Sequence, residues 1–350
     1  MRHLIILFLL LCWSVSCGRN TEKKIDYFEL EIHIKDSEPI YSDREALIGN
    51  ITSMEIFNHL LIARLAQIDY FFALIDLRDG SLLSRWGRKG RGPNEYTAIG
   101  PDFYVADSCL CFLDTGKREL NRVRITDLLD TMQSPRIQKT PYPYTASFRP
   151  KHIVPAGELF IANGSFADGA LGVIDKKGQI ADETIPYPFD CNPVEGIYRG
   201  STFQSRIKSN PRSGKFVHYY FSSDIFEIHE MKNSQPVRSC LSDFRHIPKL
   251  KVKPRGRAIY AIDYERSIAG LLRVATTDSA IYFTYSNDSY AASAQRQHVT
   301  DEILCFDWEG RKQAKYLLPL PVKEICVSGN DLYGVRYDDD EMRIYRFSLK

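Results

Sequence analysis

The sequence lacks an excess of charge of either sign. Its 46 lysines and arginines nearly balance 44 aspartates and glutamates, which leaves a formal net charge of +2. A dedicated nucleic-acid-binding domain carries a strongly basic footprint, and no run of aromatic residues among dense cations provides a platform for single strands instead. We therefore expect no nucleic-acid partner.

Sequence motifs for metal binding and for serine-hydrolase chemistry are also absent. The eight histidines include no H-x-H or H-E-x-x-H pair, the cysteines include no C-x-x-C pair, and no G-x-S-x-G occurs. The acidic run Asp338–Glu341 does not match the spacing of an EF-hand calcium loop. We therefore assign no catalytic residue and no metal ligand from the sequence.

An apolar run opens the chain. Leu4–Trp13 follows the short basic start Met1–His3, is too short to span a bilayer, and precedes the small residues Ser14–Ser16, which is the layout of a secretory signal. One hypothesis is plain cleavage after Ser16. The other, which we favour, is a bacterial lipoprotein signal, because the segment resembles a lipobox and Cys17 stands where such a signal places the lipidated residue.

The favoured interpretation divides the chain into a signal peptide (residues 1–16), a lipid-anchored polar tether (17–24) and a folded domain (25–350). A covalent lipid on Cys17 is then the one attached group that we expect. The protein would lie in the bacterial cell envelope, at the outer membrane, on its periplasmic or its surface side.

Six cysteines follow the tether. A chain of this length does not need disulfides for stability, so most of them are expected to be small buried hydrophobic residues, while one disulfide between two of them stays an open alternative. Cys109 and Cys111 are two positions apart in an expected strand and should face the same side. The six are Cys109, Cys111, Cys191, Cys240, Cys305 and Cys326.

A pattern of about 50 residues recurs six times along the chain. Each unit starts with a strand of alternating apolar residues, and most continue through a turn such as Asp-x-x-Gly into a second strand, which is typical of a β-hairpin. Six such units predict an all-β fold, a six-bladed β-propeller whose sheets stack side by side around an axis. One apolar landmark per unit marks the pattern: Leu60, Leu110, Leu159, Tyr220, Ile281 and Leu332.

The last unit shows only two clear strands, so the ring needs a further strand to close. Ile25–Ile34 has alternating apolar positions and no partner nearby. Because an incomplete blade would expose strand edges that invite aggregation, we expect this N-terminal strand to pair into the last blade. Pro186–Gly214, rich in proline, glycine, asparagine and serine, is expected to form a loop over one face, and Ile247–Arg257 a basic insertion.

The stretch RWGRKGRGPNEY, Arg85–Tyr96, is rich in glycine and cations but does not match a phosphate-binding loop. Pro93 and Asn94 stand where a Walker loop has Lys and Ser or Thr, and Glu95 stands where a dinucleotide loop has its third glycine. Pro93 and Asn94 instead suit the second and third positions of a tight turn.

This loop resembles the segment that joins blades in NHL repeats and in the TolB-like six-bladed propeller family. With the lipoprotein-like start, the chain resembles the TolB-like propeller lipoproteins of Bacteroidetes. The resemblance implies the propeller fold, a structural role for the loop and an envelope location, and it implies no established reaction. The matching loop residues are Gly87, Gly90, Gly92, Pro93 and Glu95, followed by Tyr96 and Val105-Ala106-Asp107.

Two groups of residues are candidates for ligand binding. Arg88, Lys89 and Arg91, with Arg85, either form a solvated loop balanced by a glutamate or contact an anionic ligand or partner at the rim, where salt would weaken the attraction. His59, His152 and His218 fall near expected inner strands of three units, so they either converge on the central channel or are separate strand-end or surface histidines.

Propellers host both binding and catalysis, so the fold does not decide the function. We favour a monomeric, non-catalytic scaffold of the cell envelope that binds a ligand or a partner protein through the loops of the disc faces. The alternative is a propeller enzyme of the lactonase or lyase kind, with or without a metal, whose site lies at the central channel.

Overall fold

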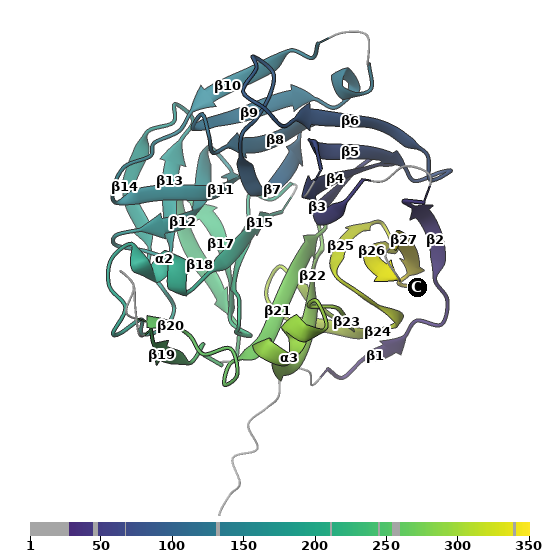
Figure 1. Ribbon diagram of the computed structural model, residues 1–350. Helices are drawn as coiled ribbons and strands as arrows, with labels where there is room; N and C mark the ends of the chain where they lie inside the picture. The colour runs from purple at the N-terminus through teal and green to yellow at the C-terminus, as the bar shows by residue number, and fades with distance from the viewer. Residues whose placement is uncertain are drawn as a thin grey trace, which may run out of the picture.

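The computed structural model describes residues 28–44, 48–66, 68–130, 134–210, 212–243, 246–253, 260–338 and 341–350, with 182–183 as backbone alone. The expected signal peptide and tether, residues 1–24, lie outside the described residues. Six antiparallel sheets stand around a common axis and close into a ring (Figure 1).

Each sheet is one blade of four consecutive strands, apart from the exchange at the N-terminus described below. The first blade comprises β3 (Asn50–Phe57), β4 (Leu60–Ala66), β5 (Tyr70–Asp76) and β6 (Leu82–Arg88). The second comprises β7 (Ile99–Ala106), β8 (Cys109–Asp114), β9 (Glu119–Arg124) and β10 (Ile137–Pro141). The third comprises β11 (Phe148–Ala156), β12 (Leu159–Phe166), β13 (Leu171–Asp175) and β14 (Ile180–Ile185).

The other three blades follow the same plan. The fourth comprises β15 (Ser205–Ser209), β16 (Phe216–Tyr220), β17 (Phe226–Lys232) and β18 (Gln235–Leu241). The fifth comprises β21 (Ile268–Thr276), β22 (Ala280–Ser289), β23 (Thr300–Asp307) and β24 (Lys312–Val322). The sixth comprises β25 (Glu324–Ser328), β26 (Asp331–Asp338) and β27 (Glu341–Ser348).

The first strand of every blade lines the axis, since β3, β7, β11, β15, β21 and β25 contact one another in turn around the ring. The six-unit prediction is therefore confirmed. The strands expected to open each unit are, however, the second strands of the blades. The reason is burial: a second strand such as β8, buried along its whole length, reads as a continuous apolar run, whereas an inner strand alternates with polar residues that face the axis.

The N-terminal segment closes the ring, as expected, but through different residues. β2 (Glu38–Ser42) pairs antiparallel with β27 and completes the sixth blade. β1 (Glu31–His33), part of the strand expected at Ile25–Ile34, instead pairs in parallel with β24 and adds a fifth strand to the fifth blade. Residues 25–27 lie outside the described part of the chain.

The long connections between blades carry small elements. The segment Pro186–Gly214, expected to be a loop throughout, contains the short helix α2 (Tyr198–Thr202) and the inner strand β15. The expected basic insertion, Ile247–Arg257, contains β19 (Leu250–Val252), which pairs with β20 (Tyr260–Ile262) just beyond it. Two further helical segments are η2 (Thr126–Leu128) and α3 (Tyr290–Gln295), and no helix of the described residues is long and apolar enough to cross a membrane.

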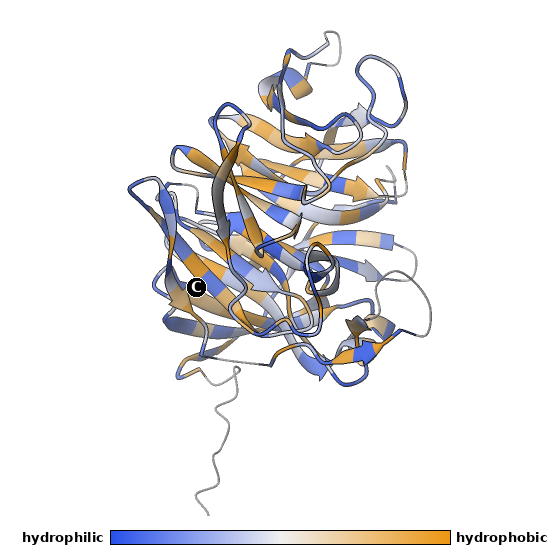
Figure 2. Cartoon of the chain, turned by 90° about the vertical axis from the view of Figure 1, so that its left-hand side faces the viewer, coloured by the Kyte–Doolittle hydropathy of each residue, from blue (hydrophilic) through white to orange (hydrophobic). Residues whose placement is uncertain are grey.

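Apolar side chains pack between neighbouring blades, and Figure 2 shows the hydrophobic residues gathered along the stacked strands. Among the described residues, five of the six blade interfaces hold clusters of twelve to fifteen buried hydrophobic residues. The interface between the second and third blades holds a cluster of seven and, apart from it, a cluster of three. This interface is the least filled, and it is where the molecule is hollowed.

We predict that Tyr41 on the closing strand is needed for stability. Its side chain is 6% exposed and packs in the cluster between the sixth and first blades. Tyr41→Ala should lower the free energy of unfolding by about 3 kcal/mol, because a large buried side chain is replaced by a cavity. Equilibrium unfolding in urea measures this change.

The matched control is Tyr198→Ala, which removes a tyrosine that is 42% exposed and should cost no more than about 0.5 kcal/mol. Equal losses in the two variants would contradict the assignment of β2 as the strand that closes the ring.

Candidate functional site

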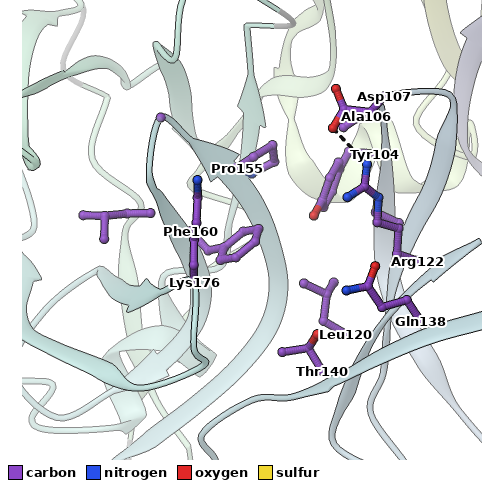
Figure 3. Close-up of a pocket in the computed structure, with 13 residues that line it drawn as sticks. Tyr104, Ala106, Asp107, Leu120, Arg122, Gln138, Thr140, Pro155, Phe160 and Lys176 are labelled. Atoms are coloured by element: carbon purple, nitrogen blue, oxygen red, sulfur yellow. Dashed lines mark hydrogen bonds and ion pairs between the residues drawn. The ribbon is translucent and has the colours of Figure 1, made fainter.

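A groove lies between the second and third blades, at the end of the disc formed by the β7–β8 and β11–β12 turns (Figure 3). We call it the inter-blade groove. Its hollow has a volume of about 410 Å³. The residues that line it are Tyr104, Ala106, Asp107, Cys111, Leu120, Arg122, Gln138, Thr140, Pro155, Gly157, Leu159, Phe160 and Lys176.

The two walls of the groove differ in chemistry. Phe160 and Pro155 of the third blade present apolar surface, while Arg122 and Gln138 of the second blade face them with polar groups (Figure 3). One guanidinium N–H of Arg122 donates to Asp107 over 2.9 Å, which holds the side chain along the wall. Such mixed linings, with an apolar surface and a few fixed polar groups, are typical of binding sites.

One of the groove residues, Cys111, is a buried thiol. Burial raises the pKa of Cys111 to about 12, so the group stays protonated at neutral pH, and the thiolate is the reactive form. Cys109 and Cys111 pack in one cluster with Tyr104, which confirms that the two cysteines face the same side.

A second hollow of about 730 Å³ adjoins the groove and shares Asp107, Arg122 and Gln138 with it. Arg124 and Arg136 line this hollow and are exposed. Along it runs β10, the outermost strand of the second blade, which among the described residues pairs with β9 alone. The two hollows together therefore form one extended and positively charged path beside a strand edge.

The axis of the ring is lined by ionisable residues, and each of the six inner strands contributes at least one. We call these residues the axial cluster: Glu55 of β3, Asp102 of β7, His152 of β11, Arg206 and Lys208 of β15, Arg273 of β21 and Glu324 of β25.

The charged groups of the axial cluster pair with one another. Lys208 of the fourth blade forms an ion pair with Glu55 of the first, and Arg273 Nε donates to Glu324 Oε2 over 2.7 Å. Burial opposes the charge of Lys208, but the carboxylates of Glu55, Asp102 and Glu324 together raise its pKa. The ammonium group therefore stays charged, as a buried ion with good partners does.

Asp102 is 4% exposed and also remains ionised. Burial alone would raise the pKa of Asp102, but Lys208, His152 and Arg206 together with the Ser53 hydroxyl, which donates to the carboxylate, hold it well below its ordinary value. A carboxylate stabilised in this way is a weak base.

His152 is the histidine of the axial cluster. It is 3% exposed, and burial lowers its pKa to about 4, since the neighbouring Asp102 carboxylate offsets only part of this effect. The imidazole is therefore neutral at pH 7. Neither ring nitrogen has a hydrogen-bond partner among the described residues.

The three candidate histidines lie in three different surroundings. Only His152 lies at the axis. His59 occupies the turn between β3 and β4, where its Nε2 lies 3.7 Å from Asp76 Oδ2, and the fully buried His218 of β16 has its Nδ1 3.3 Å from Glu227 Oε2. The structure thus brings none of the three together, and no cluster of ligands suited to a metal ion occurs among the described residues.

The loop at Arg85–Tyr96 is held by its own contacts. The backbone N–H of Gly92 donates to Glu95 Oε2 over 2.8 Å, and the N–H of Glu95 donates to the Gly92 carbonyl over 3.2 Å across Pro93. A Cβ on Gly90 would lie 1.9 Å from Glu95 Oε2, and Gly87 has a φ of +74°, which favours glycine. The structural role that the resemblance implies for Gly87, Gly90, Gly92, Pro93 and Glu95 stays a prediction.

The cations of the same loop have local contacts or lie in solvent. Arg88 Nε is 3.9 Å from Glu95 Oε1, the Lys89 ammonium lies 5.4 Å from the centroid of the Phe71 ring, and Arg91 is exposed. Neither described hollow of the second blade includes them. The six described cysteines are free thiols, and Cys17 lies outside the described residues.

Sequence reasoning assigned no residue of the groove and, apart from His152, none of the axial cluster to a site, although it had named Ala106-Asp107, Cys111 and Leu159 for structural reasons. The one available signal was the alternation Arg122-Val123-Arg124 in the strand after Cys111, where two cations share a face of an edge-proximal strand. No local sequence pattern shows that the face of β9 with Arg122 and Arg124 lies at the least filled blade interface.

These features define a six-bladed β-propeller with a groove between two blades and a charged axis. A family model described as TolB-like 6-blade propeller-like matches residues 39–330, and the chain belongs to this family. The resemblance to the TolB-like six-bladed propellers is thereby confirmed.

Two solved structures share the fold at low sequence identity. A protein assigned as exported, from Bacteroides fragilis NCTC 9343, is 14% identical with a TM-score of 0.58, and the match covers 91% of this chain and 98% of that one. A member of the DUF4221 family from Bacteroides vulgatus ATCC 8482 is 10% identical with a TM-score of 0.53, over 90% and 97% of the two chains. No curated protein matches the chain.

We predict that Lys208 of the axial cluster holds the ring together. Lys208→Met should lower the free energy of unfolding at pH 7 by about 3 kcal/mol, because it leaves buried carboxylates without their counterion. The control Lys176→Met breaks an ion pair with Glu158 whose side chains are 58% and 77% exposed, and it should cost less than about 1 kcal/mol. Chemical denaturation measures both, and a Lys208→Met loss as small as that of the control would contradict the prediction.

Proposed function

We propose that the protein is a non-catalytic scaffold of the bacterial cell envelope, anchored by a lipid on Cys17, that binds an extended acidic segment of a partner protein in the inter-blade groove. The observation that carries the proposal is the groove itself. It lies at the least filled blade interface, and it combines apolar surface with cations beside a strand edge.

Charge supports an acidic partner. The lining of the two joined hollows includes four cations against two carboxylates, namely Arg122, Arg124, Arg136 and Lys176 against Asp107 and Asp127. Arg124 and Arg136 form no ion pair within the described part of the chain. Complementary charge across an interface speeds association and favours the right partner.

Shape and backbone chemistry support an extended segment. Within the described part of the chain, β10 presents one edge that no strand pairs with. An extended peptide can add to such an edge through main-chain hydrogen bonds, with specificity from alternate side chains. Gln138 and Thr140, two positions apart on β10, both line the groove, so they would read the side chains on one face of the added segment.

The envelope location rests on the N-terminal sequence. The apolar run Leu4–Trp13, the small residues Ser14–Ser16 and Cys17 have the layout of a lipoprotein signal. The fold relative from Bacteroides fragilis is assigned as exported, which agrees with a protein that works outside the cytoplasm.

The anchor has a direct test in the intact mass of the protein extracted from membranes. We expect the mass of residues 17–350 plus a covalent lipid, and we expect Cys17→Ala to abolish both the added mass and the membrane association. The bare mass of residues 17–350 would show plain secretion instead and would remove the anchor from the proposal.

Partner binding is tested by photo-crosslinking from the groove in intact membranes. A photo-reactive amino acid at Gln138 should yield an adduct whose partner peptide, identified by mass spectrometry, is rich in Asp and Glu. Arg124→Glu with Arg136→Glu should reduce the adduct at least about tenfold, because two attractive charges become repulsive.

The matched control reverses two exposed lysines elsewhere, Lys251→Glu in β19 with Lys253→Glu just after it, and should leave the adduct unchanged. An undiminished adduct in the arginine variant, or an adduct partner without acidic residues, would overturn the proposed function.

A further inference from the structure

The outer strands of the second blade arrange their groove-facing side chains in rows that run across the sheet. Residues directly opposite each other in an antiparallel pair point to the same face. Arg122 of β9 lies opposite Gln138 of β10, and Leu120 lies opposite Thr140. All four residues line the inter-blade groove (Figure 3). Each pair therefore forms one row, and both rows end at the edge of β10 that no described strand pairs with.

A third row lies just before the N-terminal end of β10. Ile137 pairs with Val123, so one step earlier in the same register Arg136 comes next to Arg124. Both arginines are exposed and line the second hollow, and neither forms an ion pair within the described part of the chain. The rows therefore follow one another along the edge of β10 in a fixed order: two cations, then a cation with an amide, then an apolar side chain with a hydroxyl.

The two ends of this path differ in shape. At the Thr140 end the third blade closes on β10, since a Cβ on Gly178 in the β13–β14 turn would collide with the Pro141 carbonyl oxygen. Leu120 and Phe160, from the two facing blades, pack there against one apolar cluster. At the other end, all the described residues that line the second hollow belong to the second blade. An added segment would therefore be enclosed by apolar surface at one end and would lie beside solvated cations at the other.

We propose that the inter-blade groove selects its partner segment by the order of three alternate side chains: an apolar one in the row of Leu120, a polar one in the row of Gln138 and a carboxylate in the row of Arg136. This inference rests on the proposed function, because it concerns the same groove. A carboxylate between two guanidinium groups accepts charge-assisted hydrogen bonds, which are stronger than neutral ones. The amide of Gln138 both donates and accepts, and an apolar side chain beside Leu120 leaves water.

The direction of the segment follows from the sheet. Every strand pair of the second blade is antiparallel, and antiparallel pairing is slightly more stable than parallel pairing. An antiparallel segment runs from the Thr140 row to the Arg136 row. From its N-terminus to its C-terminus, its sequence is therefore apolar, any residue, polar, any residue, acidic, since side chains that face one side alternate along a strand.

Fluorescence polarisation with synthetic peptides and the full chain purified from membranes tests this order. The probe is a labelled peptide with leucine, glutamine and glutamate at alternate positions and threonine between them. The comparison peptide has the same composition with leucine and glutamate exchanged, which reverses the order. We expect saturable binding of the probe, at least about tenfold tighter than that of the reversed peptide, because the reversed order places a carboxylate against apolar surface. The affinity should fall as salt is raised.

A charge exchange separates recognition from stability. Arg124→Glu with Arg136→Glu should weaken binding of the probe at least about tenfold and should bind a peptide in which lysine replaces the glutamate. A variant that had lost its fold would bind neither peptide. The control Lys251→Glu with Lys253→Glu, in and just after β19, should bind the probe as the unchanged chain does.

Three results would overturn the inference: no saturable binding of the probe, equal or tighter binding of the reversed peptide, or no binding of the lysine peptide by the arginine variant. The proposed function stands in each case if Gln138 still captures an acidic partner in intact membranes and the arginine variant loses the adduct. Loss of that acidic adduct instead removes the proposed function, and the inference with it. The two failures are therefore distinguishable.

Discussion

The structure depends on the mutual neutralisation of charges at the axis. Glu55 belongs to the first blade and Lys208 to the fourth, which lie across the ring from each other, and yet the two side chains form an ion pair. Hydrophobic clusters connect each blade only with its neighbours, whereas this pair spans the ring. Because a buried charge without its partner is costly, an opened ring would lose contacts between neighbouring blades and would also leave Glu55 and Lys208 unpaired. The axial cluster thus couples the closure of the sixth blade to the positions of all the others.

This constraint explains why the hollow lies at the periphery. Ion pairs hold the inner strands together, and the blades diverge outward. Where two neighbouring blades have too little apolar side-chain volume, the unfilled space therefore lies away from the axis. Between the second and third blades Ile153 and Phe148 fill the inner part, while Tyr104 and Cys111 form a separate small cluster. The inter-blade groove occupies the space that larger side chains would have filled. A site formed in this way lies on rigid strands and requires no movement of the ring to accept an extended segment.

The sequence predicted those parts of the fold that depend on local patterns. Apolar runs such as that of β8 and turns with glycine were enough to count six units, and the turn from Gly92 to Glu95 follows from the proline and asparagine at its centre. The inner strands were missed because residues such as Asp102 and Lys208 interrupt their apolar pattern, and they face the axis only once the ring exists. The closing strand was placed too early because Ile25–Ile34 alternates more regularly than Glu38–Ser42, although β2 carries the buried Tyr41. The groove depends on how two blades meet, which no window of the sequence records.

The neutral state of His152 is the last consequence of the axial cluster. Within the cluster, Glu55, Asp102 and Glu324 balance Arg206, Lys208 and Arg273, so an imidazolium would add an unmatched charge. Its pKa of about 4 in the fold lies below the ordinary value near 6.5 for an exposed histidine. Since the unfolded chain takes up this proton more readily, His152 contributes stability that is present above about pH 6.5 and is lost as the pH falls through about 4. A histidine that stays neutral beside an ionised Asp102 is held as part of the packing of the axis.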